Sequence, residues 1–117
     1  MMEKNNVRIS FYLRESAIRM HRKMLDSIGN PTFIEFLISD DGKNLAVRSS
    51  KEKSLRTFRA RINGNRKTDK VEFYSQYLCN FLAQTNNWDQ NGSYRIYGNA
   101  FFKQGLAIFD LSNSEII

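Results

Sequence analysis

The apolar residues of this chain fall into short runs whose spacing changes from two to three or four and back again, twice along the sequence. Residues 7–12, VRISFY, alternate apolar and polar side chains, which is typical of a strand with one buried face. From about residue 15 to residue 28 the apolar spacing becomes one, three and four, and this pattern predicts a helix. Gly29 offers a cap for that helix, and Pro31 prevents its continuation.

Two hairpins complete this pattern, one in each half of the chain. Residues 32–39 and 45–50 are rich in aromatic and β-branched side chains, and the turn residues at 40–44 join them. In the second half we expect a strand at 55–62, a helix that begins at the acidic cap of residues 69–72 and ends by residues 85–92, and a hairpin formed by 93–98 and 105–111.

Both halves therefore show the order strand, helix and hairpin, at residues 5–50 and 54–112. A period of about 60 residues is too long for a stacked repeat array and fits two half-domains that share one core. One helix and three strands make a marginal core when they stand alone. We therefore expect one α+β domain, residues 1–117, in which two βαββ units are related by a pseudo-twofold axis. Coincidence of two similar patterns is the alternative.

Positive charge is concentrated in one quarter of the chain. Residues 43–70 hold ten basic and two acidic side chains, a net charge of +8, whereas residues 1–42 are neutral and residues 71–117 carry −2. A local field of one sign attracts polyanions. We therefore expect nucleic acid as the partner, with duplex DNA favoured. A solvated basic surface without a ligand is the alternative.

The sequence does not indicate catalysis, a metal site or a cofactor. His21 is the only histidine, and it has no Cys or second His at metal-ligand spacing. Cys79 lies among apolar residues of the second predicted helix, where a buried small hydrophobe is expected. Asp40 and Asp41 are ordinary turn residues. The protein is predicted not to be an enzyme.

The single cysteine and the absence of a long apolar run bear on location. One Cys cannot pair within the chain, which fits a reducing compartment. No stretch has the pattern of a signal peptide or of a membrane span. We expect a cytoplasmic protein without a membrane partner, and the sequence leaves room for a homo-oligomer.

Four segments carry a resemblance to a known family: VRIS (7–10), residues 17–29, FIEFLI (33–38) and KNLAVR (43–48). A strand, a short helix and a hairpin in this order resemble the swapped-hairpin unit of AbrB-like transcription regulators, and two such units in one chain are similar to the MraZ arrangement. The pieces SIGNPTFIEFLI and LAIFDL also look like short uncharacterised proteins carried by phages and mobile elements of Gram-positive bacteria.

The resemblance implies a DNA-binding regulator of transcription in a phage or mobile element. In AbrB-like dimers, basic side chains on and just after the first strand of each unit approach the DNA backbone. The residues in those places are Arg8, Arg14, Arg59, Arg61, Arg66 and Lys67. The strand pattern independently predicts that Arg59 and Arg61 project away from the apolar face. The residues that extend this basic surface are Lys51, Lys53 and Arg56.

Two other functions stay open. Tyr94, Tyr97, Phe101 and Phe102 lie along the last hairpin, and exposed aromatic side chains beside basic groups stack on single-stranded bases. The second alternative is a phage-encoded inhibitor or adaptor whose basic patch binds an acidic or nucleic-acid-binding host protein.

Overall fold

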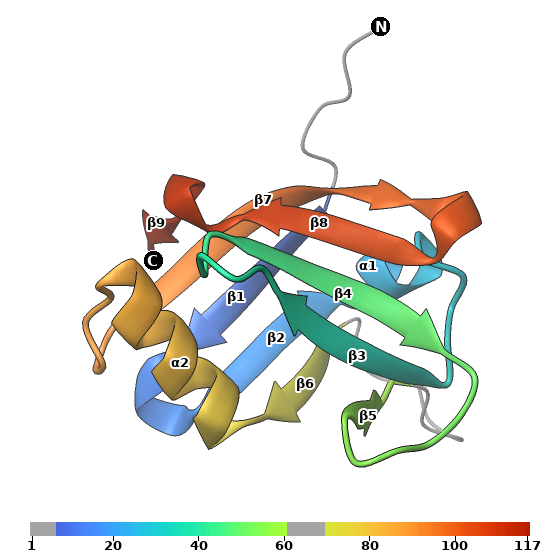
Figure 1. Ribbon diagram of the computed structural model, residues 1–117, viewed down its shortest axis with the longest axis horizontal. Helices are drawn as coiled ribbons and strands as arrows, with labels where there is room; N and C mark the ends of the chain where they lie inside the picture. Colours follow the sequence, from blue (N-terminus) through green and yellow to red (C-terminus); the bar gives the residue numbers. More distant parts are fainter. Residues whose placement is uncertain (1–6, 61–69) are drawn as a thin grey trace, which may run out of the picture.

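Antiparallel strands dominate the computed structural model, which describes residues 7–60 and 70–117 (Figure 1). The strands are β1 (Val7–Tyr12), β2 (Ala17–His21), β3 (Phe33–Ile38), β4 (Asn44–Ser50), β5 (Thr57–Arg59), β6 (Lys70–Tyr74), β7 (Ser93–Phe101), β8 (Leu106–Asp110) and β9 (Glu115–Ile116). The helices are α1 (Arg22–Asp26) and α2 (Gln76–Asn86), with short 3-10 turns η1 (Leu13–Glu15), η2 (Phe102–Gln104) and η3 (Leu111–Asn113).

Eight of the strands form a nearly closed antiparallel barrel. Their order is β5-β3-β4-β8-β7-β1-β2-β6, and the short strand β9 pairs with β7. Alternation along each strand sends one set of side chains inward. The alternation places these large side chains in the core, each with 0% of its surface exposed: Ile9, Phe11, Ile18, Ile34, Leu45, Ile96 and Phe109. The core is therefore shared by strands from both halves of the chain.

The barrel is incomplete at one place, between β5 and β6, which we call the seam. These two strands end the sheet order and are not paired with each other within the described residues. Three aromatic rings pack edge to face across the seam, with centroid distances of 5.4 Å for Phe36 and Phe58, 5.9 Å for Phe58 and Phe73, and 6.2 Å for Phe36 and Phe73. Side-chain packing thus takes the place of backbone hydrogen bonds there.

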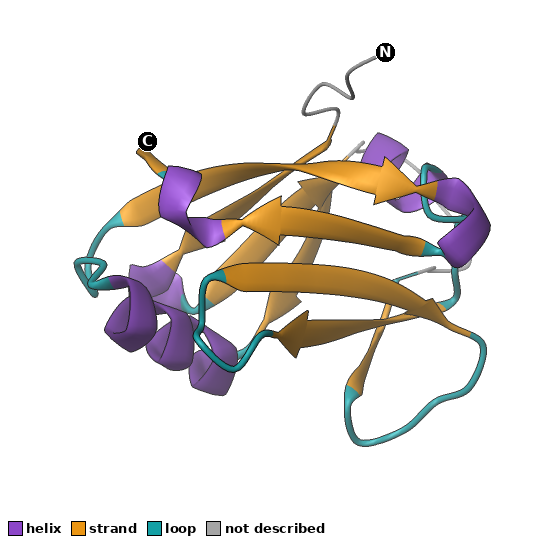
Figure 2. Cartoon of the chain, turned by 45° about the horizontal axis from the view of Figure 1, so that its top comes forward, coloured by secondary structure: helices purple, strands orange, loops and turns teal. Residues whose placement is uncertain are grey.

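Helices cover the two ends of the barrel (Figure 2). Helix α2 lies at one end, capped by the Ser75 hydroxyl, and buries Leu78, Leu82 and two smaller side chains. At the other end lie α1 and η2, since one groove is lined both by the residues that follow α1 and by η2. We refer below to the α1 end and the α2 end.

The predicted fold class is wrong. The chain is mostly β, and it is not a pair of AbrB/MraZ-like swapped-hairpin βαββ units. Each half has two strands before its helix, β1 and β2 before α1 and β5 and β6 before α2. The prediction was wrong because it assigned the residues of β2 and β6 to the helices that follow them. Ile18 and Met20 point into the barrel from β2, and Val71 and Phe73 do so from β6. These residues are two apart, as in a strand, but the apolar residues around them also fit the spacing of three or four that predicts a helix.

Other elements were predicted correctly. The strand at 7–12 is β1, the hairpin at 32–50 is β3 with β4, and the hairpin at 93–111 is β7 with β8. Of the predicted strand at 55–62, the structure describes β5. The α1 helix is much shorter than expected, and Gly29 and Asn30 follow it with positive φ angles of 100° and 49°.

Candidate nucleic-acid interface

The outer face of β7, β1, β2 and β6 presents polar side chains in cross-strand rows. On β1, Val7, Ile9 and Phe11 are buried, so Arg8 and its alternate neighbours face outward. The register pairs Arg8 with Tyr97 on β7 and His21 with Lys70 on β6. Because Ser10 is paired with Arg19, the next outward positions on β1 and β2 place Arg8 beside His21.

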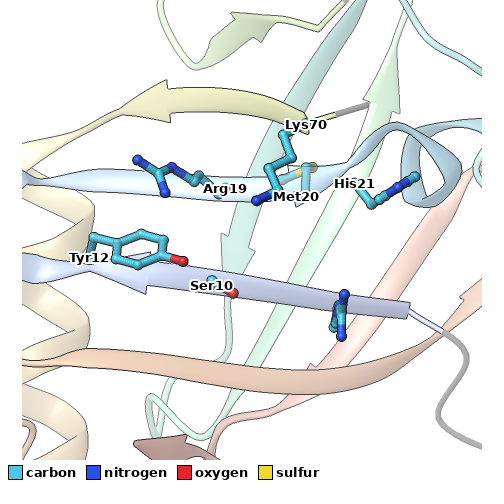
Figure 3. A pocket seen from close by; sticks show the side chains of 7 residues that line it. Ser10, Tyr12, Arg19, Met20, His21 and Lys70 are labelled. Carbon is cyan, nitrogen blue, oxygen red and sulfur yellow. The ribbon is translucent and has the colours of Figure 1, made fainter. Parts of the chain in front are cut away.

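We call Arg8, His21 and Lys70 the basic row. Its three side chains come from three adjacent strands and line a shallow pocket of about 60 Å³ (Figure 3). Arg8 is exposed and belongs to none of the three ion pairs found within residues 7–60 and 70–117. Arg8 and Lys70 place two positive charges on this face of the sheet, one on either side of His21. An anion bound over the row would be attracted by both charges.

The position of the His21 ring is set by the start of α1. Its Nδ1 atom accepts a hydrogen bond of 3.1 Å from the backbone N–H of Lys23 and so caps the helix. With Nδ1 occupied as an acceptor, the other ring nitrogen, Nε2, is left to donate a hydrogen bond. A half-exposed imidazole oriented in this way adds a donor to the row.

The neighbouring row is electrically balanced. The Arg19 guanidinium pairs with Glu72 and lies 4.5 Å from the centre of the Tyr12 ring, and the Tyr74 hydroxyl donates to Glu72. These hydrogen bonds, from Tyr74 first and then from Arg19, lower the pKa of the Glu72 carboxyl. The bond to Glu72 raises the pKa of both Tyr74 and Arg19. This network ties β2 to β6 and leaves Arg19 less available to an outside ligand.

Charge also differs between the two ends of the barrel. The α1 end carries, beside the basic row, Arg22, Lys23, Lys51, Arg59 and Lys103, together with Asp26 and with Glu52, which follows Lys51. The α2 end carries Asp41 in the turn that touches α2, Asp89 just after α2, and Asp110 at the end of β8, together with Lys43 beside the same turn and Arg14 in η1. A polyanion that approaches the barrel is therefore attracted to the α1 end.

The structure separates the residues that the sequence grouped together. Arg8 lies in the basic row, and Arg59 faces outward from β5 with its Cζ atom 5.8 Å from the centre of the Phe33 ring. Arg14 lies in η1, which packs at the α2 end. Arg61, Arg66 and Lys67 lie outside the described residues.

The loop between β4 and β5 holds the other three predicted side chains. Lys51, Lys53 and Arg56 are all exposed. Lys51 lines a groove with η2 at the α1 end, whereas Arg56 lines a different groove beside Tyr77 and Phe81 of α2. Of the predicted interface residues, Arg8, Arg59 and Lys51 therefore lie toward the α1 end, whereas Arg14 and Arg56 lie beside α2.

His21 and Lys70 were not among the predicted interface residues. The pattern that points to them is the alternation of Arg19 and His21 with Ile18 and Met20, which was interpreted as part of a helix. Once β2 is recognised as a strand paired with β6, the register brings His21 to Lys70.

Cys79, which was considered as a nucleophile, lies in the core of the protein. Cys79 is buried on α2, as predicted, and burial raises the pKa of its thiol to about 11. Such a thiol is a poor nucleophile at neutral pH. Within the described residues, no group of three His, Cys, Asp or Glu side chains is placed to hold a metal ion. That the protein is not an enzyme stays a prediction.

Comparison of the chain with models of protein families, with curated proteins and with solved structures finds no significant match. In the described part of the chain, neither helix has the length and apolar character needed to cross a membrane. The candidate interface is therefore argued from its own geometry and charge.

Proposed function

We propose that this protein binds nucleic acid through the α1 end of the barrel, with duplex DNA as its favoured form. The observation that carries the proposal is the basic row, in which Arg8, His21 and Lys70 stand side by side on three adjacent strands. Arginine and lysine at this spacing suit contacts with backbone phosphates, which give affinity and position without reading sequence.

The proposal is limited to binding. The expected role in regulating transcription depended on an AbrB-like fold, and the barrel removes that support. Phosphate contacts need no particular fold, since they depend only on the placement of charge. The α1 end provides such a placement, and Lys51 and Arg59 lie at the same end of the barrel.

Fluorescence anisotropy of a labelled duplex across a salt series tests the proposal. The Arg8→Gln variant removes one phosphate contact, so its affinity should fall several-fold. The slope of log affinity against log salt should become shallower by about 0.9. Arg14→Gln is the matched control, because Arg14 is an equally exposed arginine at the α2 end.

Equal losses in Arg8→Gln and Arg14→Gln would mean that only net charge matters and that the basic row is not the interface. No binding by the wild type at low salt would reject nucleic acid altogether. Both results are separate from any effect on folding, which circular dichroism of each variant checks.

A groove beside α2 supports a second candidate function, binding of an acidic partner protein. Phe36, Phe58 and Phe81 line this groove of about 420 Å³, and Leu55 and Tyr77 at its rim are 106% and 80% exposed. Arg56 is the charged residue of the lining. An extended acidic peptide with an apolar side chain fits this chemistry. Its binding should depend on salt far less steeply than DNA binding does.

A further inference from the structure

We infer that a groove at the α1 end of the barrel binds one nucleoside phosphate, either free or as an unpaired nucleotide of a nucleic-acid strand. For a strand, this inference rests on the proposed function and refines it. The groove measures about 480 Å³ and lies between η2, the end of β4 and the segment that follows α1. Pockets for small ligands span roughly 300–1,000 Å³, so a single nucleotide fits.

The strand register brings two lysines to this groove. A 2.8 Å hydrogen bond from the Ser49 N–H to the Gly105 carbonyl oxygen continues the pairing of β4 with β8. Two residues beyond this bond, the chain reaches Lys51 on one side and Lys103, in η2, on the other. Both lysines are exposed and both line the groove. They therefore bring two positive charges to one concave site.

The lining of the groove is positively charged. Neither Lys51 nor Lys103 belongs to an ion pair found within residues 7–60 and 70–117, and no Asp or Glu of those residues lines the groove. The carboxylates nearest to the lining along the chain are those of Asp26 and Glu52, and both side chains are exposed. A phosphate in the groove would be attracted by both lysines.

The Ser49 hydroxyl adds a hydrogen-bond donor at the floor of the groove. Its oxygen lies 2.5 Å from the point that a Cβ atom on Gly105 would occupy, and Gly105 has a positive φ of 64°. A side chain at position 105 would collide with this hydroxyl, so glycine keeps it uncovered. No hydrogen bond of the hydroxyl is found within the described residues. It is therefore able to donate to a phosphate oxygen.

Phe102 supplies an aromatic face beside the lysines. Its side chain is 66% exposed, whereas Tyr94, another of the aromatic residues that the sequence offered for stacking, is buried. Phe102 precedes Lys103 in η2 and lines the same groove. A nucleobase stacked on this ring has its phosphate close to the lysines. Because every base has a flat face that stacks, we expect no strong preference among bases.

Helix α1 separates the groove from the basic row along the chain. His21 precedes α1 and Gly29 follows it, and a helix of five residues is roughly 8 Å long. The exposed Lys23 lies on α1 between them. A duplex whose phosphates contact the basic row can therefore extend an unpaired strand past α1 into the groove. The nucleotide in the groove must be unpaired, because bases inside a duplex are stacked on one another.

Anisotropy with two labelled probes tests the strand form of the ligand: a blunt duplex, and the same duplex with an oligo(dT) overhang. Wild type should bind the overhang probe about fivefold tighter or more, as expected for one stacked base. In Phe102→Leu, which removes the ring, this preference should be lost. In Phe102→Tyr, which retains a ring, it should persist. Blunt-duplex affinity should be unchanged in both variants, and the exposure of Phe102 makes both compatible with folding.

The Lys103→Gln variant tests the phosphate contact. It should weaken binding of the overhang probe several-fold, and the slope of log affinity against log salt should become shallower by about 0.7, the value for one phosphate of a single strand. Lys43→Gln is the matched control, because Lys43 is an exposed lysine beside the turn at the α2 end. Equal losses in the two variants would show that only net charge matters and would reject the phosphate contact in the groove.

Calorimetric titration with adenosine monophosphate tests the free form of the ligand. Binding that Phe102→Leu abolishes, without an overhang preference, would assign the groove to a free nucleotide. If wild type binds the blunt duplex but shows neither nucleotide binding nor an overhang preference that depends on Phe102, the groove is rejected and the proposed function stands. If the blunt duplex does not bind, the proposed function is rejected, and the overhang and nucleotide measurements decide the groove by themselves.

Discussion

At the scale of single residues, Gly98 marks the closest approach of two neighbouring strands. A Cβ atom placed on Gly98 would lie 2.2 Å from the carbonyl oxygen of Ile108 and 2.6 Å from Cδ2 of Phe109. Both contacts are far below van der Waals distance, and one of them is to backbone that cannot move alone. Gly98 is paired on both edges of β7, with Val7 of β1 and with Phe109 of β8, and a side chain there has no room.

Gly98→Ala should therefore lower the free energy of unfolding by about 1–3 kcal/mol, as overpacking of a core does. Urea unfolding of the purified protein gives this value from the shift in midpoint. Gly92→Ala is the comparison, because a Cβ there comes no closer than 3.0 Å to its neighbours. An equal loss in both variants would show that glycine at 98 is not required by space.

Individual site residues could be predicted from the sequence only where charge alone identified them. Arg8 stands out as an arginine between two apolar residues of an evident strand. His21 does not stand out, because its place in the basic row depends on which residues the register places beside it. Lys70 was part of the basic stretch, but its strand was interpreted as a helix. The charge of the sequence therefore suggests the kind of ligand that we propose, whereas the residues of the interface depend on the strand register.

At the scale of elements, hairpins were predictable and the strands that precede the helices were not. The residues at 40–44 favour a turn between two strands, so the hairpin of β3 and β4 could be predicted from them. By contrast, β2 runs directly into α1 at His21, and β6 is followed by α2 after Ser75 alone. Without a turn between strand and helix, an apolar pattern passes from a spacing of two into one of three or four. The hydrogen bonds that decide the matter come from β1 and from the pairing of β2 with β6.

The pairing of β2 with β6 makes a prediction about pH. The pKa of Glu72 is lower in the folded chain than in the unfolded chain, so the unfolded state binds the proton first as pH falls. The stability that Glu72 contributes is present above its unfolded pKa and is lost as pH falls through its folded pKa. Wild type should exceed Glu72→Gln in stability at neutral pH, and the gap should close as pH falls below the ordinary range of a glutamate carboxyl. Urea midpoints of both proteins along this range provide the measurement, and a constant gap would contradict the assignment.

At the scale of the whole molecule, the strand order explains where the barrel stays open. Exchanging β1 to β4 with β5 to β8 turns the pairing of β3 with β5 into that of β7 with β1, and the pairing of β3 with β4 into that of β7 with β8. The pairings of β2 with β6 and of β4 with β8 are unchanged, and only the pairing of β1 with β2 has no observed counterpart. Its counterpart would join β5 to β6, which is the seam. The two halves of the chain have the same order of strands and helices. However, β1, β2, β3 and β4 of the first half each pair with a strand of the second half, and the sequence pattern along the chain does not reveal these pairings.

Because the seam is held by aromatic contacts, it should be the first part of the barrel to open. Phe58→Ala removes the ring that contacts both Phe36 and Phe73. The cost should be about 3 kcal/mol, near the lower end for loss of a core phenylalanine, since Phe58 is only partly buried. Hydrogen exchange should then show faster exchange of amides in β5 and β6, while those in β7 and β8, at the far side of the barrel, keep their relative protection. Phe58→Leu, which retains an apolar contact, should lose less. Uniform acceleration in all strands of Phe58→Ala would instead mean that the seam opens only when the whole barrel unfolds.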